Sequence, residues 1–333
     1  MLDVENLNIE ELKTSRRLVC KEALSRGWKV WLYYPENGLV RIKRDDGREL
    51  EIFSSTPPTT SAPAALRANN KYASGINFAN NGLPIPQTHL VNSADEAKVQ
   101  AQAILDSGRK VVIKPLSAAH GHGISTGLRA VEDIAPAIGR AEEYSDQFLV
   151  QEHLENFIDL RLTCIGYKFA AGLVRIPARV KGDGHHSVKE LIDLENKNPV
   201  RGENYTKPLN IIDPGSAEIF LGQRIHEVPQ ADTFVGVLGT ANVGTGGETI
   251  DITDELPAWL IEMAEKAAQV SELPVCGVDF LVAATPKNSS TEADLTPKLI
   301  EINVCPALFL HETPTFGQPR GVIKAYVDYL ASL

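Results

Sequence analysis

In the first part of the chain, apolar positions recur first at helical spacing and then in short strand-like runs. Over residues 8–27 leucines recur at helical spacing until a glycine ends the pattern, which predicts a helix. Three strand-like runs follow, at residues 28–34, 39–43 and 49–53. Residues 54–63 are rich in Ser, Thr and Pro, which is typical of a loop between lobes. We therefore predict a small N-terminal α/β lobe over residues 1–62.

Helical and strand-like patterns continue to alternate after this loop. Residues 66–80 have helical character, and residues 82–86 are expected to be extended because each proline disfavours helix at the residue before it. Ser93 and Glu96 form a capping-box pattern, which predicts a helix that runs to about Asp106. Shorter runs follow, a strand at 110–115, a helix at 131–144 and a strand at 148–152. The alternation implies α/β or α+β layers, and we place the two further lobes at residues 63–152 and 153–333.

Composition narrows the class of protein. The chain has 333 residues, of which 43% are hydrophobic and 23% charged, so a packed core is expected. The net charge of −10 argues against non-specific nucleic-acid binding, which needs an excess of Lys and Arg. The polar N-terminus predicts no signal peptide, and no apolar run has the length of a membrane helix. The four cysteines are widely spaced, as in reduced cytoplasmic proteins without structural zinc: Cys20, Cys164, Cys276 and Cys305.

A lysine and a glycine-rich segment suggest phosphate chemistry. Lys114 ends a β-branched strand, and lysine is seldom buried without a partner. Residues 117–127, which follow it, contain three glycines and several hydroxyl groups, and glycine lets backbone N–H groups approach an anion. The alternative is a simple hairpin turn, with Lys114 reaching to solvent. From these residues alone both interpretations stay open.

Two other motifs overlap the same segment. Residues 123–127 match GxSxG, the nucleophile elbow of α/β-hydrolases, but that elbow must lie between a strand and a helix that starts at once. The following residues are strand-like, so we do not favour a hydrolase with Ser125 as nucleophile. The spacing of Gly121, Gly123 and Gly127 is one residue too long for the dinucleotide fingerprint of a Rossmann fold.

Three oxygen-bearing side chains near the C-terminus suggest metal chemistry. Asp279 is the one charge in an apolar strand at 276–282, and Glu301 and Asn303 alternate along a second strand at 298–304. If the two strands pair, these side chains converge as hard oxygen ligands of the kind that Mg²⁺ prefers. The alternative is a set of isolated polar groups on an exposed sheet face.

Taken together, residues 60–330 resemble an ATP-grasp ligase, most nearly the ATP-grasp modules of cyanophycin synthetase and bifunctional glutathione synthetase. The resemblance rests on the order and spacing of several motifs: Lys71 followed by Gly82-Leu-Pro-Ile-Pro86, Val-Val-Ile-Lys114-Pro, His120-Gly-His-Gly123, Leu149-Val-Gln-Glu-His-Leu154, Asp159-Leu-Arg161, Arg175-Ile-Pro-Ala-Arg-Val-Lys-Gly-Asp-Gly184, and Glu301-Ile-Asn303. The resemblance implies an ATP-grasp fold of the α+β or α/β class, with two α+β lobes that grip ATP and a small N-terminal α/β lobe. Relatives of this kind often carry a second catalytic module, which we expect this sequence to lack.

The resemblance also implies roles for individual residues. The residues expected to bind ATP are Lys71, Lys114, His120, Gly121, Gly123, Gln151, Glu152, His153, Leu154 and Asp159. The metal ligands, for one or two Mg²⁺ ions or for Mn²⁺, are Asp279, Glu301 and Asn303. The catalytic candidates are Arg161, Arg175 and Asp183, of which Asp183 belongs to a loop at 181–187 that is expected to act as a lid. The candidates for substrate contact are His185, His186 and His311, for which a solvated or packing role is the alternative.

The activity implied by the resemblance is ADP-forming ligation of a carboxylate to an amine through an acylphosphate. The substrates are expected to be an amino acid, a short peptide or a related metabolite. The alternatives are an ATP-grasp kinase, which stops at phosphoryl transfer, and a nucleotide-binding regulatory module without turnover. We expect no nucleic-acid or membrane partner, and a homodimer is possible.

Overall fold

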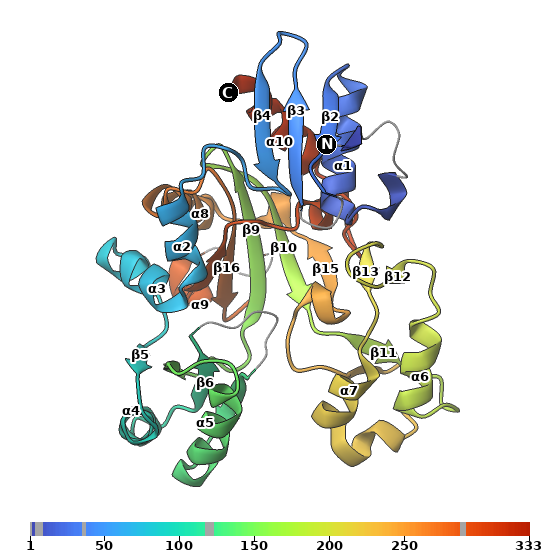
Figure 1. Ribbon diagram of the computed structural model, residues 1–333. Coiled ribbons are helices and arrows are strands. Elements are labelled where there is room, and N and C mark those ends of the chain that lie inside the picture. Colours follow the sequence, from blue (N-terminus) through green and yellow to red (C-terminus); the bar gives the residue numbers. More distant parts are fainter. Residues whose placement is uncertain (1, 4–8, 35–37, 117–122, 287–290) are drawn as a thin grey trace. The chain divides into compact units, whose positions relative to one another are not determined.

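The computed structural model describes residues 2–3, 9–34, 38–116, 123–286 and 291–333. The chain divides into two compact units, each assembled from distant segments (Figure 1). The first unit contains residues 1–59, 170–254 and 305–333, and the second contains residues 60–169 and 255–304. These units combine segments of the predicted lobes 1–62, 63–152 and 153–333, whose boundaries stay a prediction. Among the described residues no helix has the length and apolar character needed to cross a bilayer.

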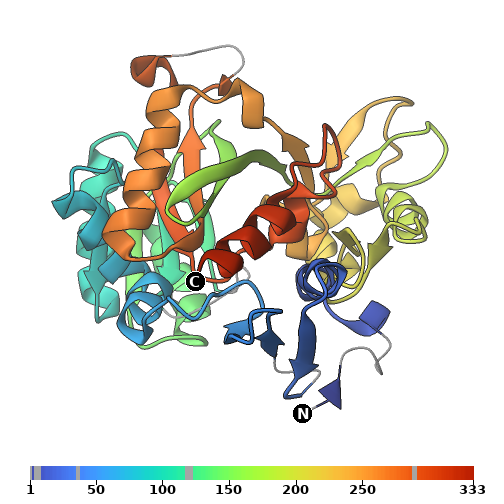
Figure 2. The same ribbon diagram turned by 90° about the horizontal axis from the view of Figure 1, so that it is seen from above.

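An antiparallel sheet forms the N-terminal part of the first unit. Its four strands lie in chain order, and their bounds are β1 (Leu2–Asp3), β2 (Lys29–Leu32), β3 (Leu39–Lys43) and β4 (Glu49–Phe53). Helix α1 (Thr14–Ser25), preceded by the 3-10 turn η2 (Ile9–Glu11), packs beside α10 (Val322–Ser332), which Figure 2 shows as the dark blue and red helices. The three predicted strands are therefore confirmed. The predicted helix at 8–27 is shorter than expected because its first turn is separated from α1.

The rest of the first unit contains further short elements. Strand β10 (Lys168–Ile176) pairs antiparallel with β15 (Glu248–Asp251), and β11 (Arg179–Lys181) pairs antiparallel with β14 (Phe234–Gly236). The remaining elements are α6 (Val188–Glu195), β12 (Arg201–Gly202), β13 (Leu209–Asn210), α7 (Pro214–Leu221), η4 (Gly222–His226), η5 (Val243–Thr245), η6 (Thr253–Glu255) and η8 (Leu308–His311). A separate apolar core holds α6 and α7 against β11, with Val180, Val188 and Leu221 among its buried side chains.

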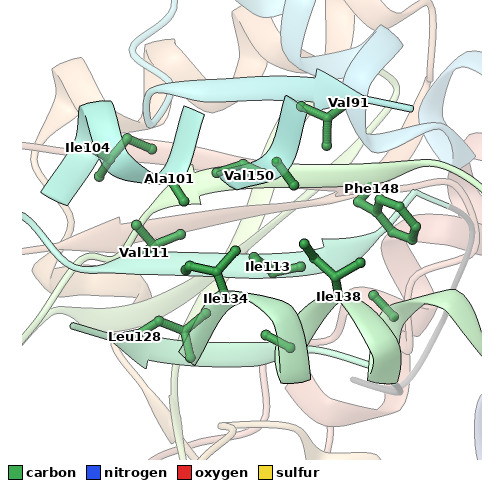
Figure 3. Close-up of a cluster of buried hydrophobic side chains, with 13 residues drawn as sticks. Val91, Ala101, Ile104, Val111, Ile113, Leu128, Ile134, Ile138, Phe148 and Val150 are labelled. Carbon is green, nitrogen blue, oxygen red and sulfur yellow. The ribbon is translucent and has the colours of Figure 1, made fainter. Parts of the chain in front are cut away.

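The second unit contains a four-stranded antiparallel sheet with two helices packed on one face. The strand order is β5 (Thr88–Val91), β8 (Phe148–Glu152), β6 (Val111–Pro115) and β7 (Ser125–Leu128). Helices α4 (Ala94–Asp106) and α5 (Ile134–Glu142), the latter preceded by η3 (Val131–Asp133), supply apolar side chains to the core. Figure 3 shows Ile104 of α4 and Ile134 and Ile138 of α5 gathered around the sheet, whose strand β6 carries both Val111 and Ile113.

The same unit also contains three antiparallel strands, two of which carry Asp279, Glu301 and Asn303. Strand β16 (Val275–Val282) lies between β9 (Ile158–Ile165) and β17 (Lys298–Asn303). Helix α8 (Ala258–Ser271) contacts both β9 and β16, and the short α9 (Glu292–Leu295) precedes β17. The strands predicted at 276–282 and 298–304 are therefore confirmed to within one residue.

Two helices replace the single helix predicted at 66–80. They are α2 (Ala62–Asn69) and α3 (Lys71–Asn80), and Asn70 between them has an extended backbone. The Asn70 side chain accepts hydrogen bonds from the backbone N–H groups of Tyr72 and Ala73, at 3.1 and 2.9 Å. An asparagine in this position caps a new helix rather than continuing the old one. The prediction was wrong because the apolar spacing alone does not reveal such a cap.

Candidate active site

The three predicted metal ligands lie on one face of neighbouring strands. Asp279 of β16 is directly opposite Glu301 of β17, and Gly277 is opposite Asn303. The Asn303 Nδ2 atom lies 3.4 Å from Asp279 Oδ2 and 3.4 Å from Glu301 Oε1. The structure therefore brings together the two carboxylates and the amide, as the strand-pairing argument predicts.

Asp279 is also in direct contact with an arginine. Arg161 of β9 is directly opposite Asp279, and its Nε and Nη2 atoms donate to the two carboxylate oxygens, the Nη2 bond being 2.8 Å long. The Asp279 side chain is 2% exposed and that of Arg161 is 10% exposed. A buried carboxylate needs such a partner because its desolvation is costly. The sequence did not reveal this pairing, since 118 positions separate the two residues.

The chemistry of this donor set fits a divalent cation that also binds phosphates. The described residues contain no cluster of three His, Cys, Asp or Glu side chains suited to a metal by themselves. Two carboxylates and one amide are nevertheless typical of Mg²⁺, which usually keeps waters and shares its coordination with substrate phosphates. The role of Asp279, Glu301 and Asn303 as metal ligands stays a prediction.

The two predicted phosphate lysines line one pocket of the second unit. This pocket has a volume of about 110 Å³, and its walls include Lys71 of α3, Lys114 and Gln151. Lys114 is only 7% exposed, and its Nζ donates to Gln151 Oε1 at 3.1 Å. Burial lowers the pKa of Lys114 to about 8, while Glu301 raises it and Lys71 lowers it further. The alternative in which Lys114 reaches to solvent is therefore wrong.

Apolar side chains form the rest of the pocket wall. They come from four separate parts of the second unit, namely helix α3, the segment before β5, strand β8 and strand β17: Ile76, Ile85, Leu149 and Leu299. Thr88 also lines the pocket, and its hydroxyl accepts a 2.6 Å hydrogen bond from Gln151 Nε2. A pocket with apolar walls and a few fixed polar groups is typical of a small-molecule site. The sequence did not single out Thr88, and its strand β5 was not predicted; the signal that it offered was a place two positions after Pro86 in the extended segment.

Comparison with known proteins reveals relatives along almost the whole chain. No protein-family model matches the sequence. The glutathione biosynthesis bifunctional protein GshAB of Listeria innocua is 28% identical over 327 residues, which cover 96% of this chain and 42% of that protein. The cyanophycin synthetase of Trichormus variabilis is 28% identical over 323 residues, covering 96% of this chain and 35% of that protein. The chain therefore spans less than half the length of these relatives.

A solved structure identifies the fold. The crystal structure of a bifunctional glutathione synthetase from Pasteurella multocida matches 98% of this chain and 44% of that chain, with a TM-score of 0.69 and 25% sequence identity. The chain has the ATP-grasp fold. The predicted α+β class and the predicted superfamily are thereby confirmed.

In this ATP-grasp chain Glu152, one of the residues predicted to bind ATP, is held by hydrogen bonds within the protein. Its Oε1 accepts a 2.9 Å hydrogen bond from the backbone N–H of Gln87, and its Oε2 pairs with Arg109. Arg109 also donates to the side chain of Gln87 at 2.9 Å. The carboxylate of Glu152 therefore fixes the end of β8 to the segment before β5. The sequence did not predict that Arg109 and Gln87 contact Glu152, because both are distant from residue 152 along the chain.

The other residues predicted to bind ATP lie in several different strands and loops. Burial lowers the pKa of His153, whose backbone N–H donates to Lys110 O at 2.8 Å. Leu154 follows it, and Asp159 lies in β9 opposite Leu281. Gly123 has a positive φ of 69°, and a Cβ there would lie 2.8 Å from Tyr144, so glycine is required. His120 and Gly121 lie outside the described residues.

The hydrolase interpretation fails on the geometry of Ser125. This residue begins strand β7 and does not sit in a turn between a strand and a helix, as a nucleophile elbow requires. Its Oγ accepts hydrogen bonds from Arg140 at 2.9 and 3.1 Å. Ser125 therefore binds a helix side chain to the strand.

The other catalytic and substrate candidates belong to the first unit. Arg175 of β10 is half-buried and lies opposite Thr249 of β15. His311, in η8, is buried and 1% exposed. Their functional roles remain predictions.

The residues of the loop at 181–187 are bound to one another. Asp183 Oδ1 accepts from the backbone N–H groups of His185 and His186, both at 2.9 Å, and its Oδ2 lies 2.6 Å from His186 Nδ1. These bonds lower the pKa of Asp183 and raise that of His186. Ser187 and Glu190 then form a capping box at the start of α6. In this structure Asp183 orders its own loop, and its catalytic role stays a prediction.

Proposed function

We propose that this chain is an ADP-forming ligase that joins a carboxylate to an amine. Its substrates would be an amino acid, a short peptide or a related metabolite. The proposal is supported chiefly by one observation, the convergence of Asp279, Glu301 and Asn303 in the unit that also contains a pocket with two lysines. The relatives, which are named for glutathione biosynthesis and cyanophycin synthesis, support a biosynthetic role.

The lysines would neutralise the phosphates of ATP. In phosphoryl transfer, catalysis is largely positioning and charge neutralisation. Lys114 is already held by Gln151, so little reorganisation is needed when a phosphate replaces solvent beside it. Burial lowers the pKa of Lys114, and a bound phosphate would raise that pKa again because a nearby negative charge favours the charged form of the lysine.

Asp279, Glu301 and Asn303 would hold one or two Mg²⁺ ions, for which Mn²⁺ can substitute. When bound, the cation neutralises phosphate charge and orients the transferred group. The substrate carboxylate oxygen would attack the γ-phosphorus of ATP, and ADP would leave. The amine would then attack the carbonyl carbon of the acylphosphate, and inorganic phosphate and a proton would leave as the amide forms. Arg161 and Arg175 are our candidates for stabilising the negative charge on these species.

The test is an ADP-release screen of amino acids and dipeptides, with mass spectrometry of the products. Release of ADP together with a new amide supports the ligase. A stable phosphorylated product would indicate the kinase instead, and no ADP with any pair of substrates would favour a regulatory module. A cytoplasmic location and a homodimer are further proposals, to be tested by fractionation and by light scattering.

A further inference from the structure

Asp279 already has a cation beside it in this structure. The guanidinium of Arg161 donates to both carboxylate oxygens, and both side chains are almost fully buried. A planar guanidinium matches a carboxylate with two parallel hydrogen bonds, which is the strongest form of this interaction. The electrostatic need of Asp279 is therefore satisfied without a metal.

The backbone around this pair is shaped to accommodate it. Gly277 lies two positions before Asp279 on the same face of β16. A Cβ at Gly277 would lie 2.8 Å from Arg161 Cδ and 3.2 Å from its Nε. The arginine thus passes over a glycine to reach Asp279, and any larger residue at position 277 would push it away.

Asn303 is also oriented for an arrangement without a divalent cation. Its Nδ2 atom, a donor, faces Asp279 Oδ2 and Glu301 Oε1. A metal ligand must instead present the amide oxygen, because the NH₂ group cannot coordinate a cation. Both Asn303 and Arg161 would therefore have to change partners when a metal is bound.

We infer that Arg161 is an internal competitor of the divalent cation for Asp279, so that the metal is bound well only together with nucleotide. A guanidinium and a divalent cation on one buried carboxylate repel each other, and phosphate groups offset that repulsion. Loading of the site then frees the Arg161 guanidinium to bind an anionic group of the substrate. This inference rests on the proposed function, because it takes Asp279 and Glu301 as metal ligands.

The experiment measures Mn²⁺ binding without nucleotide, by electron paramagnetic resonance of the free ion. Arg161→Gln keeps a hydrogen-bond donor near Asp279 but removes the charge, and its Mn²⁺ affinity should rise by at least ~10-fold over that of the native protein. Arg161→Lys keeps the charge and should stay near the native affinity. Arg67→Gln is the matched control, since Arg67 pairs with Glu272 elsewhere in the same unit and its loss should change nothing. Adding Glu301→Gln to Arg161→Gln should remove the gain.

Two results would overturn the inference. One is a folded Arg161→Gln variant, judged by circular dichroism, that binds Mn²⁺ no more tightly than the native protein. The other is an equal gain in Arg161→Lys or Arg67→Gln, since that would show that the charge at Asp279 is not the cause. If only this inference is wrong, the native protein will still release ADP in the substrate screen. If the proposed function itself is wrong, the native protein will release no ADP.

A second measurement uses the native protein and does not depend on the folding of a variant. The Arg161 Nε–H group should give a nuclear magnetic resonance signal that is shifted by its bond to Asp279. Adding Mg²⁺ with a non-hydrolysable ATP analogue should move this signal, while either component alone should move it less. A signal that the two together leave unchanged would show that Arg161 keeps Asp279 and would refute the exchange.

Discussion

Replacing Lys114 by methionine is expected to stabilise the nucleotide-free protein and at the same time to weaken its affinity for ATP. Lys114 is buried beside Lys71, and burial is the main cause that lowers its pKa from 10.5 to about 8. A charged group in such a place destabilises the folded state relative to the unfolded chain, in which the lysine is solvated. Methionine has a similar length and no charge, so it removes this cost.

The magnitude follows from the difference between the two pKa values. Each pKa unit corresponds to about 1.4 kcal/mol, so a difference of about 2.5 pKa units costs ~3 kcal/mol at pH 7. The variant also loses the hydrogen bond to Gln151, which contributes ~1 kcal/mol. We therefore expect Lys114→Met to raise the free energy of unfolding by about 2 kcal/mol.

The pH dependence has a defined sign. The folded protein has the lower pKa, so between about pH 8 and pH 10.5 the unfolded chain binds more protons and the native protein gains stability as pH rises. Lys114→Met lacks this gain. The stability difference between the two proteins should therefore shrink by roughly 2 kcal/mol between pH 7 and pH 9.5.

Urea denaturation at both pH values measures these differences, and isothermal titration measures ATP affinity. Lys98→Met is the control, because the Lys98 side chain is 44% exposed on the surface helix α4 and its loss should change stability by less than ~0.5 kcal/mol at either pH. The loss of one charge-assisted phosphate contact should weaken ATP binding by ~10- to 100-fold. A Lys114→Met variant that is less stable than the native protein at pH 7, with a difference that does not change with pH, would refute this reasoning.

Three further predictions concern the metal site, the core and the loop. Glu301→Ala should abolish ADP release with an unchanged circular dichroism spectrum, and native ADP release by this variant would remove Glu301 from the site. Ile138→Ala should lower the free energy of unfolding by ~3 kcal/mol in urea, since this side chain is 2% exposed in the core of α5 and its sheet; a loss below ~1 kcal/mol would mean that the core can collapse around the change. His186 should titrate above its ordinary pKa of 6.5 because of its bond to Asp183, so that this ion pair is lost as pH rises through the raised pKa. In Asp183→Asn the pKa of His186, followed by nuclear magnetic resonance, should fall, and an equal or higher pKa would contradict the assignment.

The sequence by itself determined the elements whose signals are local. Alternation of polar and apolar side chains placed Glu301 and Asn303 on one face of a strand, and the structure confirms that strand and its pairing with the strand of Asp279. Ser93 likewise marked the start of α4, because a helix cap depends only on residues within one turn. The resemblance to ATP-grasp proteins then supplied the fold, which the solved relative supports.

Only the tertiary structure determined which polar side chains pair with one another. Arg161 meets Asp279 from a strand that lies 118 positions away, and Glu152 is held by Gln87 and Arg109 from two other segments. Such pairings depend on the register between strands, and a shift of one residue would turn each side chain to the other face. This register cannot be predicted from residues that are neighbours in the sequence. The ion pairs of Asp279 with Arg161 and of Glu152 with Arg109 were therefore found only in the structure.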